Sequence, residues 1–175
     1  MKQVAKFEKV SFDQFKTVLE QNTKFTEEEI KKVYDDIKLP KRATTGSAGY
    51  DFYMPYSVVI GQNESRIIYT GIRCKLEEGY VLQLYPRSSI GIKRNLNLKN
   101  TVGIVDSDYY NADNEGHIMV ALRSTGPVII NGISYDSAVL DKGEAFVQGI
   151  FMPYYITYDD EVSEQRTGGI GSTSN

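Results

Sequence analysis

Cysteine, histidine and tryptophan are nearly missing from this chain of 175 residues, which contains one cysteine, one histidine and no tryptophan. With Cys74 alone, the chain can form no intramolecular disulfide, cysteine-rich zinc site or CxxC redox pair. With His117 alone, it has no multi-histidine metal site, and a Ser-His or Cys-His catalytic pair is disfavoured. Its chemistry must therefore use carboxylates, arginine, tyrosine and hydroxyl groups.

Excess positive charge and long apolar runs are also lacking. Lys and Arg number 20 against 23 Asp and Glu, which is not the balance of a surface built to neutralise nucleic-acid phosphates. No apolar run is long enough to span a bilayer, and the opening MKQVAKFEKV lacks the apolar core of a signal peptide. We therefore predict a soluble, cytoplasmic protein whose partners include neither nucleic acid nor a membrane.

The first forty residues predict a helical extension. Ser11 with Gln14 and Thr26 with Glu29 have capping-box spacing, and apolar residues recur at helical spacing up to Ile37. This pattern indicates two short amphipathic helices within residues 11–38, which end before Pro40.

From Tyr50 onward, short segments rich in Val, Ile and Tyr alternate with turn residues, a rhythm typical of a β-sandwich or barrel. The expected strands are 50–53, 57–60, 66–69, 71–76, 80–85, 102–105, 117–122, 127–130 and 145–151. No βαβ context supports a Rossmann or P-loop fold. We predict an all-β domain over residues 41–160 and a flexible glycine-rich arm over 161–175.

Five polar clusters stand out against this β background. In SAGYDF, Asp51 follows a glycine, which by itself is a common turn pattern. In YPRSSIGIKRN, the cation of Arg87 and the hydroxyls of Ser88 and Ser89 suit phosphate oxygens, although a serine helix N-cap explains them equally well.

The third cluster, NLKNTVGIVDSDYY, combines an amide, a carboxylate and a ring. Asn100 in a β-hairpin could pair with a pyrimidine edge, Asp106 could act as a general base, and Tyr109 could lie beside a sugar. An Asp-rich turn is the simpler explanation of this cluster alone.

The last two clusters are KGEAFVQGIFMP and RTGGIGSTSN. Gln148 is a polar side chain within an apolar strand, so it either ties strands together or faces a ligand. The tail could clamp an anion through Arg166, Ser172 and Thr173 if it folds over a polyphosphate.

Taken in order, AGYD, PRSSIGIK, NTVGIVDSDY, KGEAFVQGIFMP and RTGGIGST resemble the five motifs of the trimeric dUTPases, the dUTP diphosphatases. The resemblance covers residues 41–174. It implies a distorted jelly-roll of the β-clip type and a homotrimer with active sites shared between subunits. It also implies Mg²⁺-dependent hydrolysis of dUTP to dUMP and pyrophosphate, which keeps uracil out of DNA and supplies dUMP for dTMP synthesis.

The resemblance also implies roles for individual residues on the nucleoside side. Asp106 resembles the aspartate that activates the attacking water. Tyr109 resembles the tyrosine beneath the deoxyribose, where a 2'-hydroxyl does not fit. Asn100 resembles the residue that reads uracil together with backbone groups, and Gly103 belongs to the same substrate-binding segment.

On the phosphate side, Ser88 resembles the serine at the α,β-bridging oxygen, with Arg87 and Ser89 beside it. Gln148 resembles the phosphate-side glutamine, and Asp51 the acid that holds a magnesium-bound water, so that no side chain ligates the metal directly. Arg166 resembles the arginine of an arm that closes over the phosphates from another subunit, with Ser172 and Thr173 in the same arm.

Three features depart from the family pattern. Ile170 occupies the arm position that usually carries an aromatic over the uracil, so weaker substrate binding is expected. The segment YNADNE, residues 110–115, is longer than usual, as an enlarged surface loop would be. The helical extension over residues 1–40 lies outside the motifs.

Two alternatives remain open. The related dCTP deaminases share the fold, although the glycine-rich arm and the Asp106–Tyr109 pair fit dUTP hydrolysis better. Some phage members of the family also bind repressor proteins, and the extra helices and longer loop are added surface of a kind that could serve such a partner.

Overall fold

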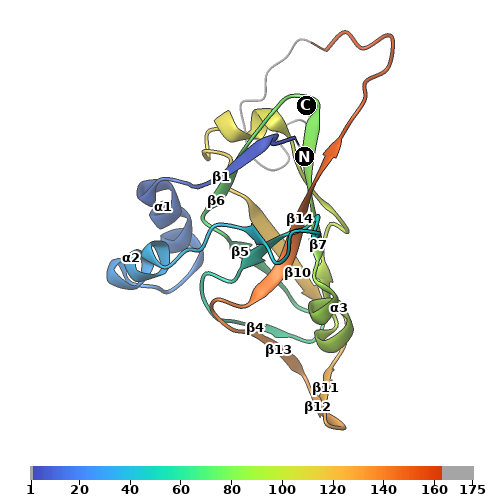
Figure 1. Cartoon of the computed structure of the whole chain (residues 1–175). Coiled ribbons are helices and arrows are strands. Elements are labelled where there is room, and N and C mark those ends of the chain that lie inside the picture. The colour runs from blue at the N-terminus through green and yellow to red at the C-terminus, as the bar shows by residue number, and fades with distance from the viewer. Residues whose placement is uncertain (1, 163–175) are drawn as a thin grey trace.

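The computed structural model describes residues 2–162, which form a mostly β body with two helices on one side (Figure 1). The helices are α1 (Phe12–Asn22), α2 (Glu27–Asp35) and α3 (Ser88–Arg94), with a short 3-10 helix η1 (Ser107–Asn111). The strands are β1 (Ala5–Lys9), β2 (Lys41–Arg42), β3 (Tyr50–Tyr53), β4 (Val58–Gly61), β5 (Ser65–Tyr69), β6 (Ile72–Leu76), β7 (Tyr80–Pro86), β8 (Leu96–Leu98), β9 (Gly103–Val105), β10 (Met119–Ser124), β11 (Val128–Ile130), β12 (Ile133–Tyr135), β13 (Ser137–Leu140) and β14 (Ala145–Pro153).

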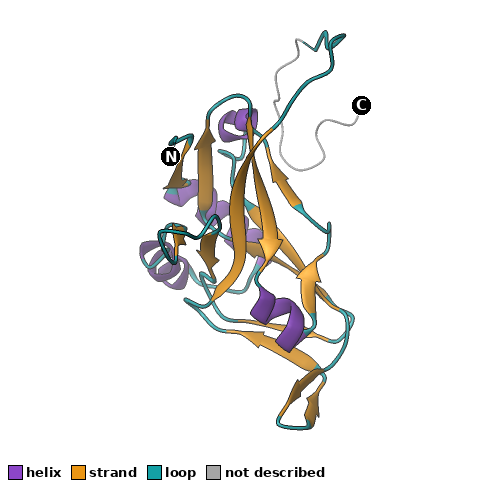
Figure 2. Cartoon of the chain, turned by 45° about the vertical axis from the view of Figure 1, so that its right-hand side comes forward, coloured by secondary structure: helices purple, strands orange, loops and turns teal. Residues whose placement is uncertain are grey.

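The largest sheet has five strands in the order β2-β3-β14-β7-β9, and the described pairings between them are antiparallel. Its central strand, β14, is a long apolar segment between two partners (Figure 2). Gly149 lies where a side chain could not fit, since a Cβ there would come within 2.8 Å of Leu82 and 3.0 Å of Phe52. This close packing holds β3, β14 and β7 in one rigid layer.

The remaining strands form smaller sheets: β5-β10-β8, β1-β6, β13-β4 and β11-β12. The β11–β12 hairpin projects from the end of the body opposite the last part of β14 (Figure 1). Asn131 and Gly132 connect its strands with φ of 50° and 80°, as a type I′ turn requires. The many short antiparallel strands confirm the predicted all-β, jelly-roll-like fold.

The N-terminal segment is not only helical, because residues 5–9 form β1 and pair with β6. The predicted pair of helices is confirmed as α1 and α2. Thr26 and Glu29 form the expected capping box. The expected Ser11–Gln14 box is half formed: Ser11 accepts the N–H of Gln14, while the carboxylate that accepts the Ser11 N–H comes from Glu115.

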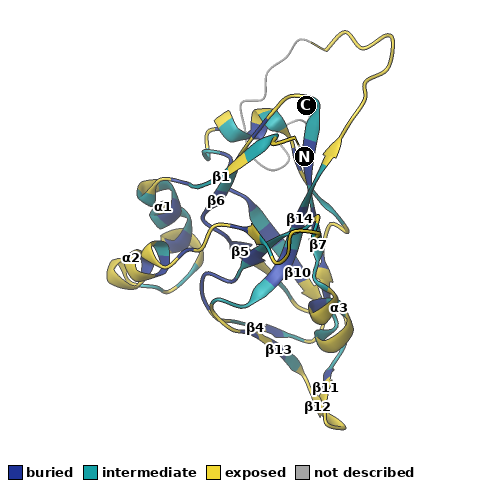
Figure 3. Ribbon diagram, viewed as in Figure 1, coloured by how far each residue is buried: buried dark blue, intermediate teal, exposed yellow. Residues whose placement is uncertain are grey.

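Buried residues occur both on the helices α1 and α2 and on the strands (Figure 3), and they belong to one core cluster. Phe15, Leu19 and Ile30 of the helices are fully buried in the same apolar cluster as Phe52 and Phe146 of the five-stranded sheet. Burial of each such side chain stabilises the fold by about 1.5–3 kcal/mol. The N-terminal segment is therefore part of the domain's core.

The expected strands after Tyr50 each overlap a strand of the structure, but several elements were not predicted. These are β1, β2, β8, β12, β13, α3 and η1. Most are strands of two to four residues, too short for alternation to be recognised, and β12 is exposed at all three positions. Within residues 2–162, no helix is long and apolar enough to cross a membrane.

Candidate functional site

A cleft of about 430 Å³ brings together the polar residues of three sequence clusters. Its lining includes Asp51 on β3, Arg87, Ser88 and Ser89 at the junction of β7 and α3, and Gln148 on β14. The structure thus assembles, from segments nearly one hundred residues apart, every predicted phosphate-side residue that lies within residues 2–162.

The register of the five-stranded sheet explains this convergence. Gln148 pairs with Asp51 on one side and with Tyr85 on the other. Arg87 follows two residues after Tyr85, and its N–H donates to the carbonyl of Phe146 at 3.1 Å. Because residues opposite one another on neighbouring strands point to the same face, the carboxylate and the amide lie side by side.

An ion pair links the charged groups of the cleft. The Arg87 Nε lies 3.2 Å from Asp51 Oδ1, and both side chains are partly buried. The guanidinium is thereby held at the wall of the cleft. A fixed cation with further N–H donors is suited to bind phosphate oxygens.

Gly49 makes the room that Gln148 occupies, a role that the sequence analysis missed. A Cβ at this position would lie 2.5 Å from Gln148 Oε1. The AGYD motif therefore has two roles: its glycine leaves space for the Gln148 amide, and its aspartate provides a carboxylate.

The serine helix cap, the alternative explanation of the second cluster, does not describe the structure. Arg87 is the N-cap residue of α3 and makes no side-chain capping hydrogen bond. Ser88 and Ser89 are the first two helical residues and are exposed to the cleft. Their hydroxyls and the backbone N–H groups of this first turn are suited to hydrogen-bond an anion.

The nucleoside-side residues lie elsewhere in the chain and do not line this cleft. Asn100 is exposed in the connection between β8 and β9. The β-hairpin expected around it is instead a turn, because β8 pairs with β10 while β9 pairs with β7. Gly103 lies opposite Leu84, and a Cβ there would come within 3.0 Å of the Leu84 side chain.

Asp106 directly precedes η1, and Tyr109 lies within it. Asp106 is exposed at the N-cap of this short helix, directly after the buried Val105. Tyr109 is buried, its hydroxyl donates to the carbonyl of His117 at 2.8 Å, and Asn114 Nδ2 donates to the same hydroxyl at 2.8 Å. The ring therefore has one fixed orientation.

Four predicted site residues lie outside the described part of the chain: Arg166, Ile170, Ser172 and Thr173.

The oxygen groups in the cleft fit a magnesium ion that is bound mainly by a phosphate-containing substrate. Within residues 2–162, no three His, Cys, Asp or Glu side chains gather into a metal-binding group. Mg²⁺ commonly keeps several waters and is bound through one or two carboxylates together with substrate phosphates. The single carboxylate of Asp51 among phosphate-binding groups is such a donor set.

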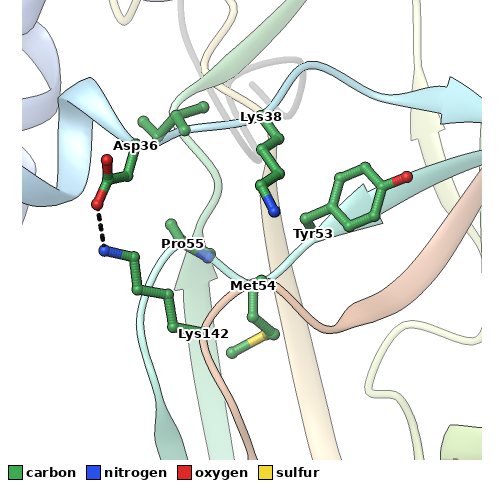
Figure 4. A pocket seen from close by; sticks show the side chains of 8 residues that line it. Asp36, Lys38, Tyr53, Met54, Pro55 and Lys142 are labelled. Atoms are coloured by element: carbon green, nitrogen blue, oxygen red, sulfur yellow. Dashed lines mark hydrogen bonds and ion pairs between the residues drawn. The ribbon is translucent and has the colours of Figure 1, made fainter.

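A second cavity, of about 310 Å³, lies where the end of α2 meets the strands (Figure 4). Its wall includes an ion pair of 2.6 Å between Lys142 Nζ and Asp36. Lys38 points toward the ring of Tyr53, with its Nζ 5.9 Å from the ring centroid. None of the predicted site residues lines this cavity, and its ion pair ties the N-terminal segment to the β13–β14 turn.

Comparison with known proteins identifies consistent relatives. A family model described as dUTPase matches residues 35–173. The chain is 42% identical over 140 residues to the deoxyuridine 5'-triphosphate nucleotidohydrolase of Lactococcus lactis subsp. lactis (strain IL1403), with 78% of this chain and 88% of that protein covered. It is 32% identical over 150 residues to the enzyme of the same name from Hydrogenobaculum sp. (strain Y04AAS1), covering 82% and 95%.

Solved structures agree. The dUTPase of Streptococcus mutans matches with a TM-score of 0.63 and 33% identity, covering 86% of this chain and 97% of that one. A mutant dUTPase from phage phi11 of S. aureus, described with a structural Mg(II) ion, matches with a TM-score of 0.63 over 93% and 98% of the chains. At 17% identity, the phage protein supports the fold alone.

Proposed function

Since the chain belongs to the dUTPase family, and so hydrolyses dUTP to dUMP and pyrophosphate, we propose that it does so at composite sites of a homotrimer. The observation that carries this proposal is the separation of the predicted site into two groups. The phosphate-side residues Asp51, Arg87 and Gln148 line one cleft, whereas Asn100 and Asp106 lie outside it.

A composite site resolves this separation. In the proposed arrangement, the cleft of one subunit holds the triphosphate, while the segment from Asn100 to Tyr109 of another subunit holds the nucleoside. The phosphate-side residues lie on or directly beside β3, β7 and β14 of the large sheet, and Asp106 directly follows β9 at its edge. Rigid elements of this kind can hold reacting groups in place before substrate arrives.

On the nucleoside side, Asp106 is proposed as the general base. Its carboxylate is exposed at the start of η1, where a water can reach it. Transfer of a proton from that water to Asp106 would generate the nucleophile that attacks the α-phosphorus, and pyrophosphate would leave. Tyr109 would present its ring to the deoxyribose, and Asn100 with the backbone near Gly103 would read the uracil edge.

On the phosphate side, Arg87 and the first turn of α3 are proposed to bind the negatively charged oxygens, with Gln148 as a further hydrogen-bonding group. Mg²⁺ would be held by the triphosphate with Asp51 nearby, and when bound it would neutralise phosphate charge. Arg166, Ser172 and Thr173 are proposed to complete the site from the C-terminal arm, with Ile170 over the uracil.

The decisive experiment supplies Mg²⁺ and, separately, dUTP, dCTP, dTTP and UTP, and identifies the products by chromatography. We expect dUMP and pyrophosphate from dUTP alone. Asp106→Asn should lower kcat by about 10²–10⁴-fold, the usual contribution of a positioned general base. A mutant with wild-type kcat would refute the role of Asp106, and light scattering that shows a monomer would refute the composite site.

Two alternatives have different tests. Release of dUTP or dUMP from dCTP would indicate a deaminase, but the relatives are named nucleotidohydrolases. A repressor protein is the second candidate partner, because phage 80alpha dUTPases of the same fold are described as controlling the transfer of virulence genes. If the protein associates with a phage repressor, and dUTP alters that association, the result would support this regulatory role.

A cytoplasmic location is also proposed, because the substrate dUTP belongs to the nucleotide pool.

A further inference from the structure

Two of the three departures from the family pattern, the N-terminal segment and the 110–115 loop, are bonded to each other. Glu115 in the loop accepts hydrogen bonds from the N–H and the hydroxyl of Ser11, at 2.7 and 2.6 Å. Ser11 is the N-cap of α1, so Glu115 supplies the acceptor that Gln14 was expected to provide. The loop thereby caps a helix more than one hundred residues away.

A second contact joins the same two segments through β6. The Arg73 guanidinium lies 3.9 Å above the ring of Tyr110, and it approaches Glu8 at 3.6 Å and Glu115 at 3.7 Å. The Tyr110 hydroxyl donates to Glu8 at 2.6 Å. Arg73 and Glu8 are directly opposite each other in the β1–β6 pair, so the strand register fixes this cluster.

The loop contains a left-handed stretch of backbone, which is supported by hydrogen bonds within the loop and by the contacts with the N-terminal segment. Glu115 has φ of 57° and Gly116 has φ of 68°. A left-handed backbone is costly for a residue with a side chain and persists only where the surroundings impose it. The bonds from Ser11 to the Glu115 carboxylate are contacts of that kind.

From this loop the contacts lead directly to Tyr109. Asn114 Nδ2 donates to the Tyr109 hydroxyl at 2.8 Å, while Asn114 Oδ1 accepts the N–H of Gly116 at 3.2 Å. The Tyr109 hydroxyl in turn donates to the carbonyl of His117. Two hydrogen bonds of the Tyr109 hydroxyl thus come from residues 114–117, a segment in which Glu115 is bonded to Ser11 of the N-terminal segment.

We propose that Asn114 is a positioning residue that fixes the ring of Tyr109, and that Ser11 and Glu115 hold Asn114 in place, so that the N-terminal segment helps the enzyme to reject ribonucleotides. This inference rests on the proposed role of Tyr109 beside the deoxyribose. The bond from Asn114 adds to the His117 bond in resisting movement of the ring away from a 2'-hydroxyl, and its loss should loosen the ring.

The first test is Asn114→Ala, which removes the donor to Tyr109, with Asn114→Asp as a companion that keeps an acceptor for the Gly116 N–H but can only accept the Tyr109 O–H. We expect the ratio of kcat/KM for dUTP over UTP to fall by about tenfold, the effect of one neutral hydrogen bond. Partial unfolding would reduce the activity on both substrates equally and leave the ratio unchanged. An unchanged ratio in Asn114→Asp and in Asn114→Ala would overturn the proposal.

The second test is a double-mutant cycle on the same ratio with Ser11→Ala and Glu115→Gln. Each single variant should lower the ratio, and the double variant should lower it by less than the product of the two effects. Thr26→Ala is the matched control, since it removes the N-cap of α2 without contact to the loop. A strictly multiplicative cycle, or an equal effect of the control, would overturn the link to the N-terminal segment.

The wild-type measurement separates this inference from the function on which it rests. A wild-type enzyme that hydrolyses dUTP and UTP equally would refute the sugar-facing role of Tyr109 and the inference together. A selective wild type with equally selective variants would refute the inference alone.

Discussion

The buried His117 makes the stability of this protein depend on pH in a defined window. The imidazole has no exposed surface and packs near Phe15 and Tyr69. Its Nε2 accepts the N–H of Gly71 at 2.9 Å, so the neutral ring carries its proton on Nδ1. Nδ1 has no hydrogen-bond partner within residues 2–162. Protonation would therefore place a buried charge and break the bond to Gly71.

Burial lowers the pKa of His117 from 6.5 to about 4, although the nearby Glu115 acts in the opposite direction. Above pH 6.5 the folded and unfolded chains both hold a neutral imidazole, so His117 imposes no cost on folding. As the pH falls from 6.5 towards 4, only the unfolded chain binds the proton, so folding is progressively disfavoured. Between pH 7 and pH 5 this linkage should cost about 2 kcal/mol per chain.

Two measurements check this value. Because the chain has one histidine, its imidazole resonances need no assignment, and an NMR titration of the folded protein should give a midpoint near pH 4. Urea unfolding at pH 7 and pH 5, at one protein concentration, should show the loss of about 2 kcal/mol per chain. His117→Gln keeps an acceptor for the Gly71 N–H but cannot titrate, so its stability should change much less over this range.

The result that refutes the reasoning is a His117 midpoint near 6.5, or the same pH dependence in His117→Gln. The His117→Gln control separates the effect of the imidazole from that of the carboxylates. The pKa of Glu8, for example, is lowered to about 2 by hydrogen bonds from Lys6 and Tyr110 and by nearby positive charge. The stability that ionised Glu8 provides is lost only as the pH falls below 4.5, the ordinary pKa of a glutamate.

Two further predictions concern the cleft and the core. Gly49→Ala should push the Gln148 amide aside and lower kcat/KM for dUTP by about 10- to 100-fold, as small misplacements in active sites do. Gly46→Ala, with nothing within 4 Å of the new methyl group, is its control, and equal kcat/KM values in a steady-state assay would contradict the steric argument. Phe15→Ala should lower the free energy of unfolding by about 3–5 kcal/mol in urea titrations, as deletion of a buried ring does. The exposed Leu39→Ala should cost far less, and a similarly small loss for Phe15→Ala would show that the N-terminal helices are not part of the core.

Much of the fold could be predicted because turn residues and strand composition alternate clearly after Tyr50. The strand predicted over 50–53 has the same bounds as β3. The Asn131–Gly132 pair carried a further signal that was not used, since this dipeptide is the preferred type I′ hairpin turn. By contrast, β2 contains two residues and exists only because β3 offers it an edge. No local pattern can predict a strand of that kind.

The candidate site could be predicted from the order of its motifs, but not its spatial division. The register of β3, β14 and β7 reveals that Asp51 and Gln148 are neighbours, whereas Asp106 does not line their cleft. Asn114 was overlooked because its contribution is a contact with Tyr109, in a loop that resembled ordinary surface chain. Positioning residues have no signature of their own in sequence, since their importance lies in what they touch.

The bond between Glu115 and Ser11 also has a consequence for protein engineering. A loop transplanted by itself into a relative that lacks this N-terminal segment would carry a left-handed Glu115 without the two hydrogen bonds from Ser11. An N-terminal segment transplanted alone would begin its first helix without the carboxylate that caps it. Designers who wish to move either element between scaffolds should therefore move both as one part.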